Sequence, residues 1–217
     1  FLTKYFILCL ENVKDAQQYV PEFLEDIVKK TLFCISFIKT PDDKIPLFNG
    51  GSNNDIKYLD KYIEDLKIKK KNNDKKILGG IFRAKTRNQL LFVDTDGPPS
   101  KNFSKNYQSG PLSFEYFLDG TKVITNCGFG KNISLKAELI SRLTASQSTL
   151  TINETSVTKF ERNKLINRIF GNAIKNTFKT NELNLKNDKT FAGCSLIHNG
   201  YEKKFKCIHK REIYINK

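Results

Sequence analysis

The sequence predicts a mainly β protein, an antiparallel β-sandwich preceded by a short α-helical segment. Up to about residue 68 the apolar residues recur every three or four positions, which is the spacing of amphipathic helices. After residue 76 they recur at alternate positions, which is the spacing of strands. These strands follow one another without intervening helices, an order typical of a sandwich.

The N-terminal stretch up to residue 38 is expected to form a helical hairpin. Apolar residues such as Leu10 and Val28 recur at helical spacing, and Pro21 stands where a second helix would begin, a position that favours proline. A loop over 45–52, with two glycines that permit positive φ, leads to an amphipathic helix over 53–68. We expect these helices to be only part of a domain.

The lysine-rich stretch over 67–76 is the expected boundary between the helical and the β part. Short polar turns beyond it predict two hairpins, and further strands follow. The expected strands cover residues 77–84, 89–94, 112–118, 122–126, 148–153, 190–198 and 205–215. Residues 163–178 have helical propensity, but we expect strands and loops there.

The formal net charge is +14, with 37 basic residues against 23 acidic ones. A field of this sign attracts nucleic acid, anionic membranes and acidic polysaccharide, and it does not choose among them. The alternative is a compositional bias, because lysine and asparagine also fill the loops. No apolar run approaches the ~20 residues of a bilayer-spanning helix, so we expect no membrane span.

The sequence lacks the strong local signatures of several enzyme classes. It holds no Walker loop, no GxGxxG after a strand, no HExxH and no GxSxG. With 2 histidines it cannot form an all-histidine metal centre, and its 5 cysteines lack the paired spacing of structural zinc sites. We therefore expect neither a metal nor a cofactor.

Both ends of the chain are expected to continue into a longer protein. The chain begins at Phe1 and holds no methionine, and a β-like run stops at Lys217 without a turn or a partner strand. A targeting signal would then lie upstream of the chain.

Several short strings carry the information about function. They lie at 107–116, 123–128, 141–152, 197–201 and 207–211. Together they resemble the C-terminal β-sandwich of the heparinase II/III-like polysaccharide lyase family, in which HAxxLSFE, NCG or DxG, RxTxAH, HDGY and HxR elements follow in this order. The resemblance covers residues 77–217. Residues 1–70, with the Leu-Phe-Asn-Gly-Gly string, resemble the C-terminal helices of that family's α/α-toroid domain.

The resemblance implies β-elimination on a uronic-acid polysaccharide, and it implies a periplasmic or cell-envelope location. In this reaction the enzyme neutralises the uronate carboxylate, a base removes the C5 proton, and an acid protonates the departing O4. Tyrosine and histidine usually share the acid and base roles in such lyases. Most of these groups lie on the toroid, so no catalytic residue is assigned within this chain.

This chain departs from the family pattern at Gln108 and Gln147, which stand where two strings of the family present histidines. A carboxamide does not titrate near neutral pH and is a poor zinc ligand. The replacements argue against a metal and favour, as the alternative function, a polysaccharide-binding relative without catalysis.

We expect Gln108 and Gln147 to line the substrate cleft, and Arg142, His198 and His209 to contact the polyanion. A structural role is the alternative for each. Glu115 is expected either to orient a neighbouring group or to face solvent.

Nucleic-acid binding is the lowest-ranked function. It predicts aromatic residues interleaved with basic ones on one exposed sheet face, and Phe103 and Tyr107 are the only loop aromatics near such a pattern.

Overall fold

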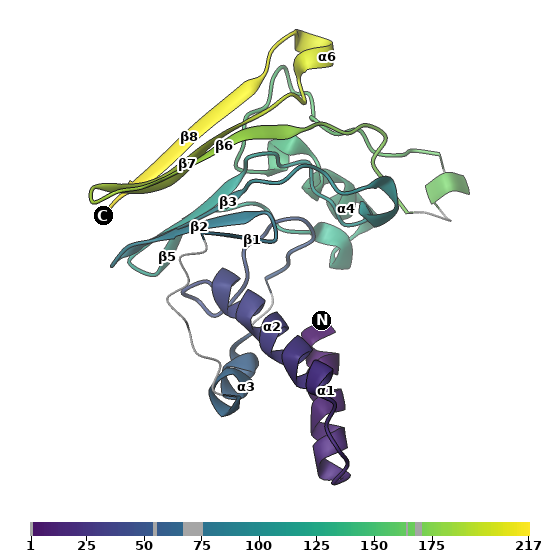
Figure 1. Cartoon of the computed structure of the whole chain (residues 1–217). Helices are drawn as coiled ribbons and strands as arrows, with labels where there is room; N and C mark the ends of the chain where they lie inside the picture. Colours follow the sequence, from purple (N-terminus) through teal and green to yellow (C-terminus); the bar gives the residue numbers. More distant parts are fainter. Residues whose placement is uncertain (1, 54–55, 67–75, 164, 168–170) are drawn as a thin grey trace. The chain divides into compact units, whose positions relative to one another are not determined.

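The computed structural model of the chain describes residues 2–53, 56–66, 76–163, 165–167 and 171–217 (Figure 1). The chain divides into two compact units. The helical unit comprises Phe1–Ile45 and Asn54–Lys75, and the β unit comprises Pro46–Asn53 and Lys76–Lys217. Residues 46–53, called the 46–53 loop below, therefore belong to the β unit although both flanking segments belong to the helical one.

The helical unit confirms the predicted hairpin, formed by α1 (Leu2–Asp15) and α2 (Glu22–Ile38). Pro21 precedes α2 in an extended conformation, φ −61° and ψ 130°, which proline adopts without strain. The third helix is shorter than predicted, with a 3₁₀ turn η1 (Lys57–Leu59) leading into α3 (Asp60–Asp65). The core consists of Ile7, Leu10, Leu24, Val28, Leu32, Ile56, Leu59 and Ile63.

The β unit holds two antiparallel sheets, which confirms the predicted fold class. The 5-stranded sheet runs in chain order β1-β2-β3-β4-β5, and the 3-stranded sheet runs β6-β7-β8. Their bounds are β1 (Ile77–Leu78), β2 (Ile81–Lys85), β3 (Gln89–Asp94), β4 (Phe114–Leu118), β5 (Thr121–Ile124), β6 (Thr180–Asn187), β7 (Phe191–His198) and β8 (His209–Asn216).

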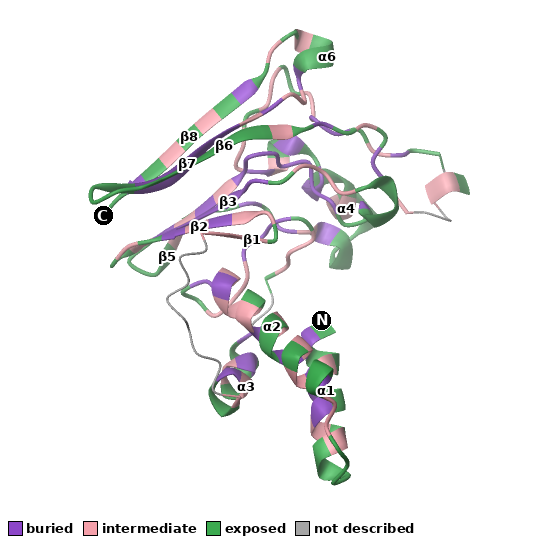
Figure 2. Cartoon of the chain, in the orientation of Figure 1, coloured by how far each residue is buried: buried purple, intermediate pink, exposed green. Residues whose placement is uncertain are grey.

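The sandwich core forms where apolar residues of the two sheets meet. Its buried members are Phe82, Ala84, Leu91, Val93, Leu112, Ala192, Cys194, Leu196 and Ile215. Strand β7 is buried along most of its length, whereas β6 is exposed over seven of its eight residues (Figure 2). Strand β7, at the centre of its sheet, therefore contributes Ala192, Cys194 and Leu196 to this core, and β6 is an edge strand.

The second face of the 5-stranded sheet is also covered. Leu90 and Phe92 of β3 and Phe117 of β4 pack with Phe48 of the 46–53 loop. Glu115 pairs with Phe92 across the two strands, so it projects to this covered face. The prediction that Glu115 faces solvent is therefore wrong, because the loop shields the face on which it lies.

The connections differ most from the sequence-based expectations. Residues 148–153 form an isolated bridge between Ile152 and Thr155 in place of a strand, and β8 begins only at His209, after the short helix α6 (Glu202–Phe205). Helix α4 (Leu135–Ser141) and strand β6 were not predicted. Short 3₁₀ turns lie at η2 (Lys101–Phe103), η3 (Gly130–Asn132) and η4 (Thr144–Ser146).

Residues 163–178 combine a helical turn at 165–167 with an isolated bridge between Phe160 and Ile174, and positions 164 and 168–170 lie outside the described residues. The predicted helix residues 54–55 and 67–68 also lie outside them. In the described part of the chain, no helix has the combination of length and apolar character that crossing a bilayer requires.

Candidate functional site

Gln108 and Gln147 lie together in the β unit, where both bind the carbonyl of Ser141, the last residue of α4. Nε2 of Gln108 donates to this oxygen at 2.9 Å and to the Gly128 carbonyl at 2.9 Å, and Nε2 of Gln147 donates to it at 2.7 Å. Oε1 of Gln108 accepts from the amide of Gly50 at 3.0 Å. Buried polar atoms need such partners, so both glutamines support the main chain, and their contact with a glycan stays a prediction.

The groups around the two glutamines do not suit a metal ion. Sγ of Cys127 lies 3.8 Å from Nε2 of Gln147, and burial raises the pKa of the Cys127 thiol, which keeps it protonated at neutral pH. The amide nitrogens of both glutamines point to carbonyls and cannot act as ligands. Within the described residues, no three His, Cys, Asp or Glu side chains are grouped so as to hold a metal.

Arg142 is buried and joins the 104–107 segment to the segment at Asn172. Its Nε donates to the carbonyl of Tyr107 at 2.8 Å, its Nη1 to Asn172 at 2.6 Å and its Nη2 to Ser104 at 2.8 Å. The guanidinium lies 4.0 Å from the centroid of the Phe160 ring. Burial lowers the pKa of Arg142 to about 10, so the group stays charged at neutral pH. Its predicted contact with a polyanion is not tested by these bonds.

His198 and His209 face each other across β7 and β8, and Nε2 of His198 lies 3.0 Å from Nδ1 of His209. The amide of Gly200 donates to Nδ1 of His198 at 3.0 Å, so Nε2 of His198 carries the proton and donates to His209. Burial lowers the pKa of His198 to about 3 and that of His209 to about 4. Both rings are neutral at pH 7, and a polyanion contact by either would rest on hydrogen bonding.

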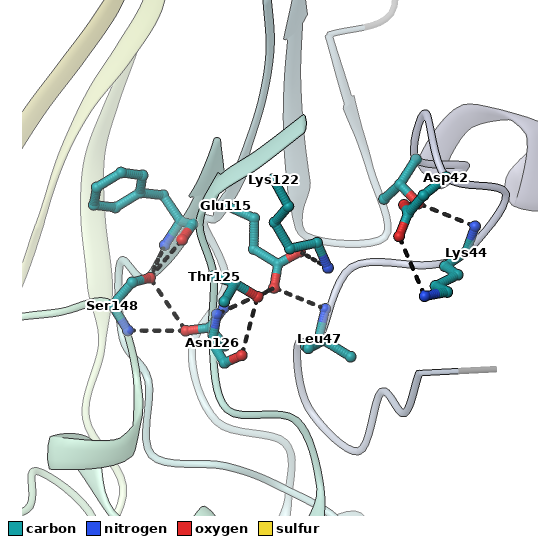
Figure 3. Close-up of polar contacts among 10 residues, drawn as sticks. Asp42, Lys44, Leu47, Glu115, Lys122, Thr125, Asn126 and Ser148 are labelled. Carbon is teal, nitrogen blue, oxygen red and sulfur yellow. Dashed lines mark hydrogen bonds and ion pairs between the residues drawn. The ribbon is translucent and has the colours of Figure 1, made fainter. Parts of the chain in front are cut away.

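Glu115 is the centre of a buried network that fixes the 46–53 loop (Figure 3). Its Oε1 accepts from the amide of Leu47 at 3.2 Å, from Oγ1 of Thr125 at 2.8 Å and from the amide of Asn126 at 3.1 Å. Its Oε2 lies 3.6 Å from Nζ of Lys122. The carboxylate therefore has both donors and a cation, which is how a buried charge is stabilised.

Asn126 extends this network to Ser148. Its Oδ1 accepts from the amide of Ser148 at 2.9 Å and lies 3.1 Å from the Ser148 hydroxyl, which also donates to the carbonyl of Phe114 (Figure 3). The end of β5 and the segment at 148 are thus tied to β4. Hydrogen bonding of Ser148 to β4 replaces the strand predicted over 148–153.

A cleft opens beside the end of β3, with a volume of about 450 Å³. It is lined by Phe48, Asn49, Gly79, Ile81, Asp94, Asp96, Gly97, Pro98, Pro99, Phe103, Asn106 and Tyr107. Asp94 is its most buried acid, and its Oδ2 accepts from Nδ2 of Asn49 at 3.0 Å. Burial raises the pKa of Asp94 to about 7, an effect that outweighs its two hydrogen bonds, from Asn49 and from the amide of Asp96.

Sequence reasoning missed Asp94, and for Glu115 it left burial and solvent exposure open. A signal for Asp94 was present, because residues 90–93 are apolar and the strand then ends on an acid that is followed by Gly97 and Pro98. An ionisable side chain at the end of a buried strand is a candidate site. Glu115 gave no such signal, since its burial depends on the 46–53 loop.

Comparison with known proteins gives one family. The family model for the heparinase II/III-like C-terminal domain matches residues 77–217. No curated protein sequence matches the chain.

Solved structures share the fold. A mutant of the heparan sulfate lyase HepC from Pedobacter heparinus has a TM-score of 0.67 and 14% identity, and the match covers 98% of this chain and 34% of that chain. A heparinase III gene product with methylated lysines has a TM-score of 0.61 and 17% identity, covering 89% and 30%. The chain thus spans about a third of the length of these proteins.

Proposed function

Because the chain belongs to the heparinase II/III-like family, a polysaccharide lyase family, we propose that it is part of a lyase that cleaves acidic, uronic-acid-containing polysaccharide by β-elimination. The family match over residues 77–217 carries this proposal. The heparan sulfate lyases among the similar structures support it, and the net charge of +14 favours an anionic polymer.

The proposal extends to the helical unit and to location. We propose that α1, α2 and α3 are the last helices of an α/α-toroid, and that the protein acts in the periplasm or cell envelope. In such a lyase the acid and base would come from the toroid, and the β unit would shape one wall of the cleft. Gln108 and Gln147 would then act as positioning residues, since they hold the end of α4 and the 46–53 loop.

A binding protein without catalysis is the second candidate. Gln108 and Gln147 favour it, because they replace the histidines of the family pattern. Both also donate to the same Ser141 carbonyl. Neither side chain can act as a base at neutral pH. On this reading the polymer is retained by the sandwich but not cleaved.

The test is the ultraviolet absorbance of unsaturated uronates, followed while the whole lyase, of which this chain is proposed to be a part, is incubated with heparan sulfate, alginate and polygalacturonate. A lyase produces a rise with at least one polymer and none with the same polymer after its carboxyl groups are reduced, because reduction removes the acidity of the C5 proton. Binding of each polymer, measured in parallel at two salt concentrations, separates the two candidates. Salt-resistant binding without a rise supports the binding protein, and equal, salt-labile binding to DNA and glycans contradicts both.

A further inference from the structure

The cleft beside β3 has features of a binding site that the proposed chemistry does not use. Its four lining segments are 48–49, 79–81, 94–99 and 103–107, all in the β unit. Its volume of about 450 Å³ falls within the roughly 300–1,000 Å³ of small-molecule sites. Apolar, aromatic and polar side chains all contribute to its surface, as in most ligand sites.

The charge of the cleft is opposite to that of the chain. Among the described residues that line it there are two carboxylates, Asp94 and Asp96, and no Lys, Arg or His. The whole chain carries 37 basic residues, so this local absence of cations is a distinct feature of the cleft. A uronate or sulfate placed here would face the carboxylate of Asp96 and the carboxyl of Asp94, whose pKa is raised to about 7, without a counter-ion. The cleft therefore disfavours an acidic sugar ring.

Asp94 has capacity for further hydrogen bonds. Residue Asp94 is 4% exposed, and its carboxyl accepts from Nδ2 of Asn49 at 3.0 Å and from the amide of Asp96 at 3.3 Å. An ionised carboxylate offers about four acceptor positions, so about two remain for a ligand. The pKa of about 7 has the same origin, because burial removes more solvation than these donors replace. Hydroxyl or ammonium donors of a ligand would complete the shell.

Phe103 supplies an apolar surface at the same cleft. Its side chain is 82% exposed, and it ends the short turn η2. The next residue, Ser104, is fully buried; its hydroxyl donates to the Lys101 carbonyl and accepts from the amide of Ile174. The hydrogen bonds of the buried Ser104 hydroxyl thus fix the turn, while the aromatic ring of Phe103 remains in solvent. A sugar ring has an apolar face that can pack on such a ring while its hydroxyls reach the polar side.

We propose that this cleft binds a sugar ring without an acidic group, which packs on Phe103 and donates hydroxyl or ammonium hydrogen bonds to Asp94. The inference rests on the proposed function and applies to a polymer such as heparan sulfate, in which uronates alternate with non-acidic sugar residues, because the ring would be one of those residues. The cleft would then set the register of the polymer by selecting which of its residues lies beside β3. Asn49 orients the Asp94 carboxyl for this contact.

The experiment measures binding of three tetrasaccharides to the 217-residue chain by titration calorimetry. These are a glucosamine, an N-acetylglucosamine and a galacturonate oligomer. We expect one or both non-acidic oligomers to bind. Any binding of the acidic oligomer should not change in the cleft variants. Phe103→Ala weakens the non-acidic binding about tenfold through lost apolar contact. Asp94→Asn weakens glucosamine more than N-acetylglucosamine if the donor is an ammonium group, and both equally if the donors are hydroxyls.

Matched controls lie on α2, where Phe23 and Asp26 are exposed, so Phe23→Ala and Asp26→Asn should leave binding unchanged. The cleft proposal is overturned if neither non-acidic oligomer binds, or if Phe103→Ala and Asp94→Asn weaken only the galacturonate oligomer. Cleavage and binding of the acidic polymers, measured on the same variants, test the proposed function separately. If the polymers are cleaved or bound while the cleft variants have no effect, the cleft proposal fails alone. If the non-acidic oligomers bind and no acidic polymer does, only the proposed function fails.

Discussion

Two buried acids lie on neighbouring strands of the β unit and differ in the groups that stabilise their negative charge. Glu115 on β4 accepts three hydrogen bonds on one oxygen and has Lys122 beside the other. Asp94 at the end of β3 accepts two hydrogen bonds and has no cation among the described residues around the cleft. Burial alone therefore does not distinguish a structural acid from one that is available to a ligand. The ion pair with Lys122, which Asp94 lacks among the described residues around its cleft, does.

The largest expected effect follows removal of Glu115, the acid with an ion pair. Glu115→Ala leaves the amides of Leu47 and Asn126 and the ammonium of Lys122 without their partner, so we expect a loss of about 4 kcal/mol in the free energy of unfolding. Urea denaturation measures it. Glu115→Gln is the control, because its amide oxygen can accept the same hydrogen bonds. Equal losses for both variants would mean that volume, and not acceptor chemistry, fixes the 46–53 loop.

Asp94→Asn is expected to raise the free energy of unfolding, in contrast to Glu115→Ala. The pKa of Asp94 is raised from its ordinary value near 4 to about 7, so the folded state holds a proton that the unfolded state releases. Compared with the variant, the native protein has its highest free energy of unfolding below pH 4. This relative free energy of unfolding falls as the pH rises to 7. Above that pH, Asp94→Asn should gain about 2 kcal/mol. Urea denaturation at pH 4, 5.5 and 8 checks this, and a gain that does not change with pH contradicts it.

Lys122→Met sharpens the comparison by making Glu115 resemble Asp94. The ammonium lies 3.6 Å from Oε2 of Glu115 and is partly exposed, so we expect a loss of about 1.5 kcal/mol, smaller than that of Glu115→Ala. Urea denaturation measures the loss. Lys210→Met, which removes an exposed ion pair with Glu212, serves as the control and should change little.

The histidine pair makes stability change with pH in the direction opposite to that of Asp94, and by a smaller amount. The pKa values of His198 and His209 are lowered by burial to about 3 and about 4, so the unfolded state takes up protons first as the pH falls below about 6.5. Stability is then lost from pH 6.5 downward. His209→Gln keeps an acceptor for His198 and should reduce the loss between pH 7 and pH 5 by about 1 kcal/mol. Thermal unfolding at both pH values tests it, and an unchanged loss would contradict the assigned neutral pair.

The sequence predicted elements whose evidence is local. The hairpins of α1 with α2 and of β2 with β3 follow from apolar spacing and short polar turns, and they are present. Strand β6 was missed because seven of its eight residues are exposed, so its sequence carries no core pattern. Helix α4 was missed because it has only 7 residues and lies between the strings at 123–128 and 141–152, sharing only Ser141 with the second.

Roles of individual side chains were harder to predict because they depend on distant partners. Gln108 reaches Gly50, 58 residues away, and Arg142 bonds carbonyls 30 to 38 residues away. The family strings identified these residues as noteworthy. They did not reveal that the polar atoms are engaged with the main chain, since no spacing rule reports a tertiary hydrogen bond.

The discontinuous make-up of the β unit has a consequence for folding. The 46–53 loop contributes the Phe48 ring and the Leu47 amide to a sheet that begins only at Ile77. During synthesis this segment therefore leaves the ribosome before any strand that it will cover. Closing the 68-residue separation between Leu47 and Glu115 costs entropy that shorter hairpins avoid. A polypeptide started at residue 77 would fold with Phe92 and Phe117 uncovered, so the minimal autonomous sandwich begins upstream of its first strand.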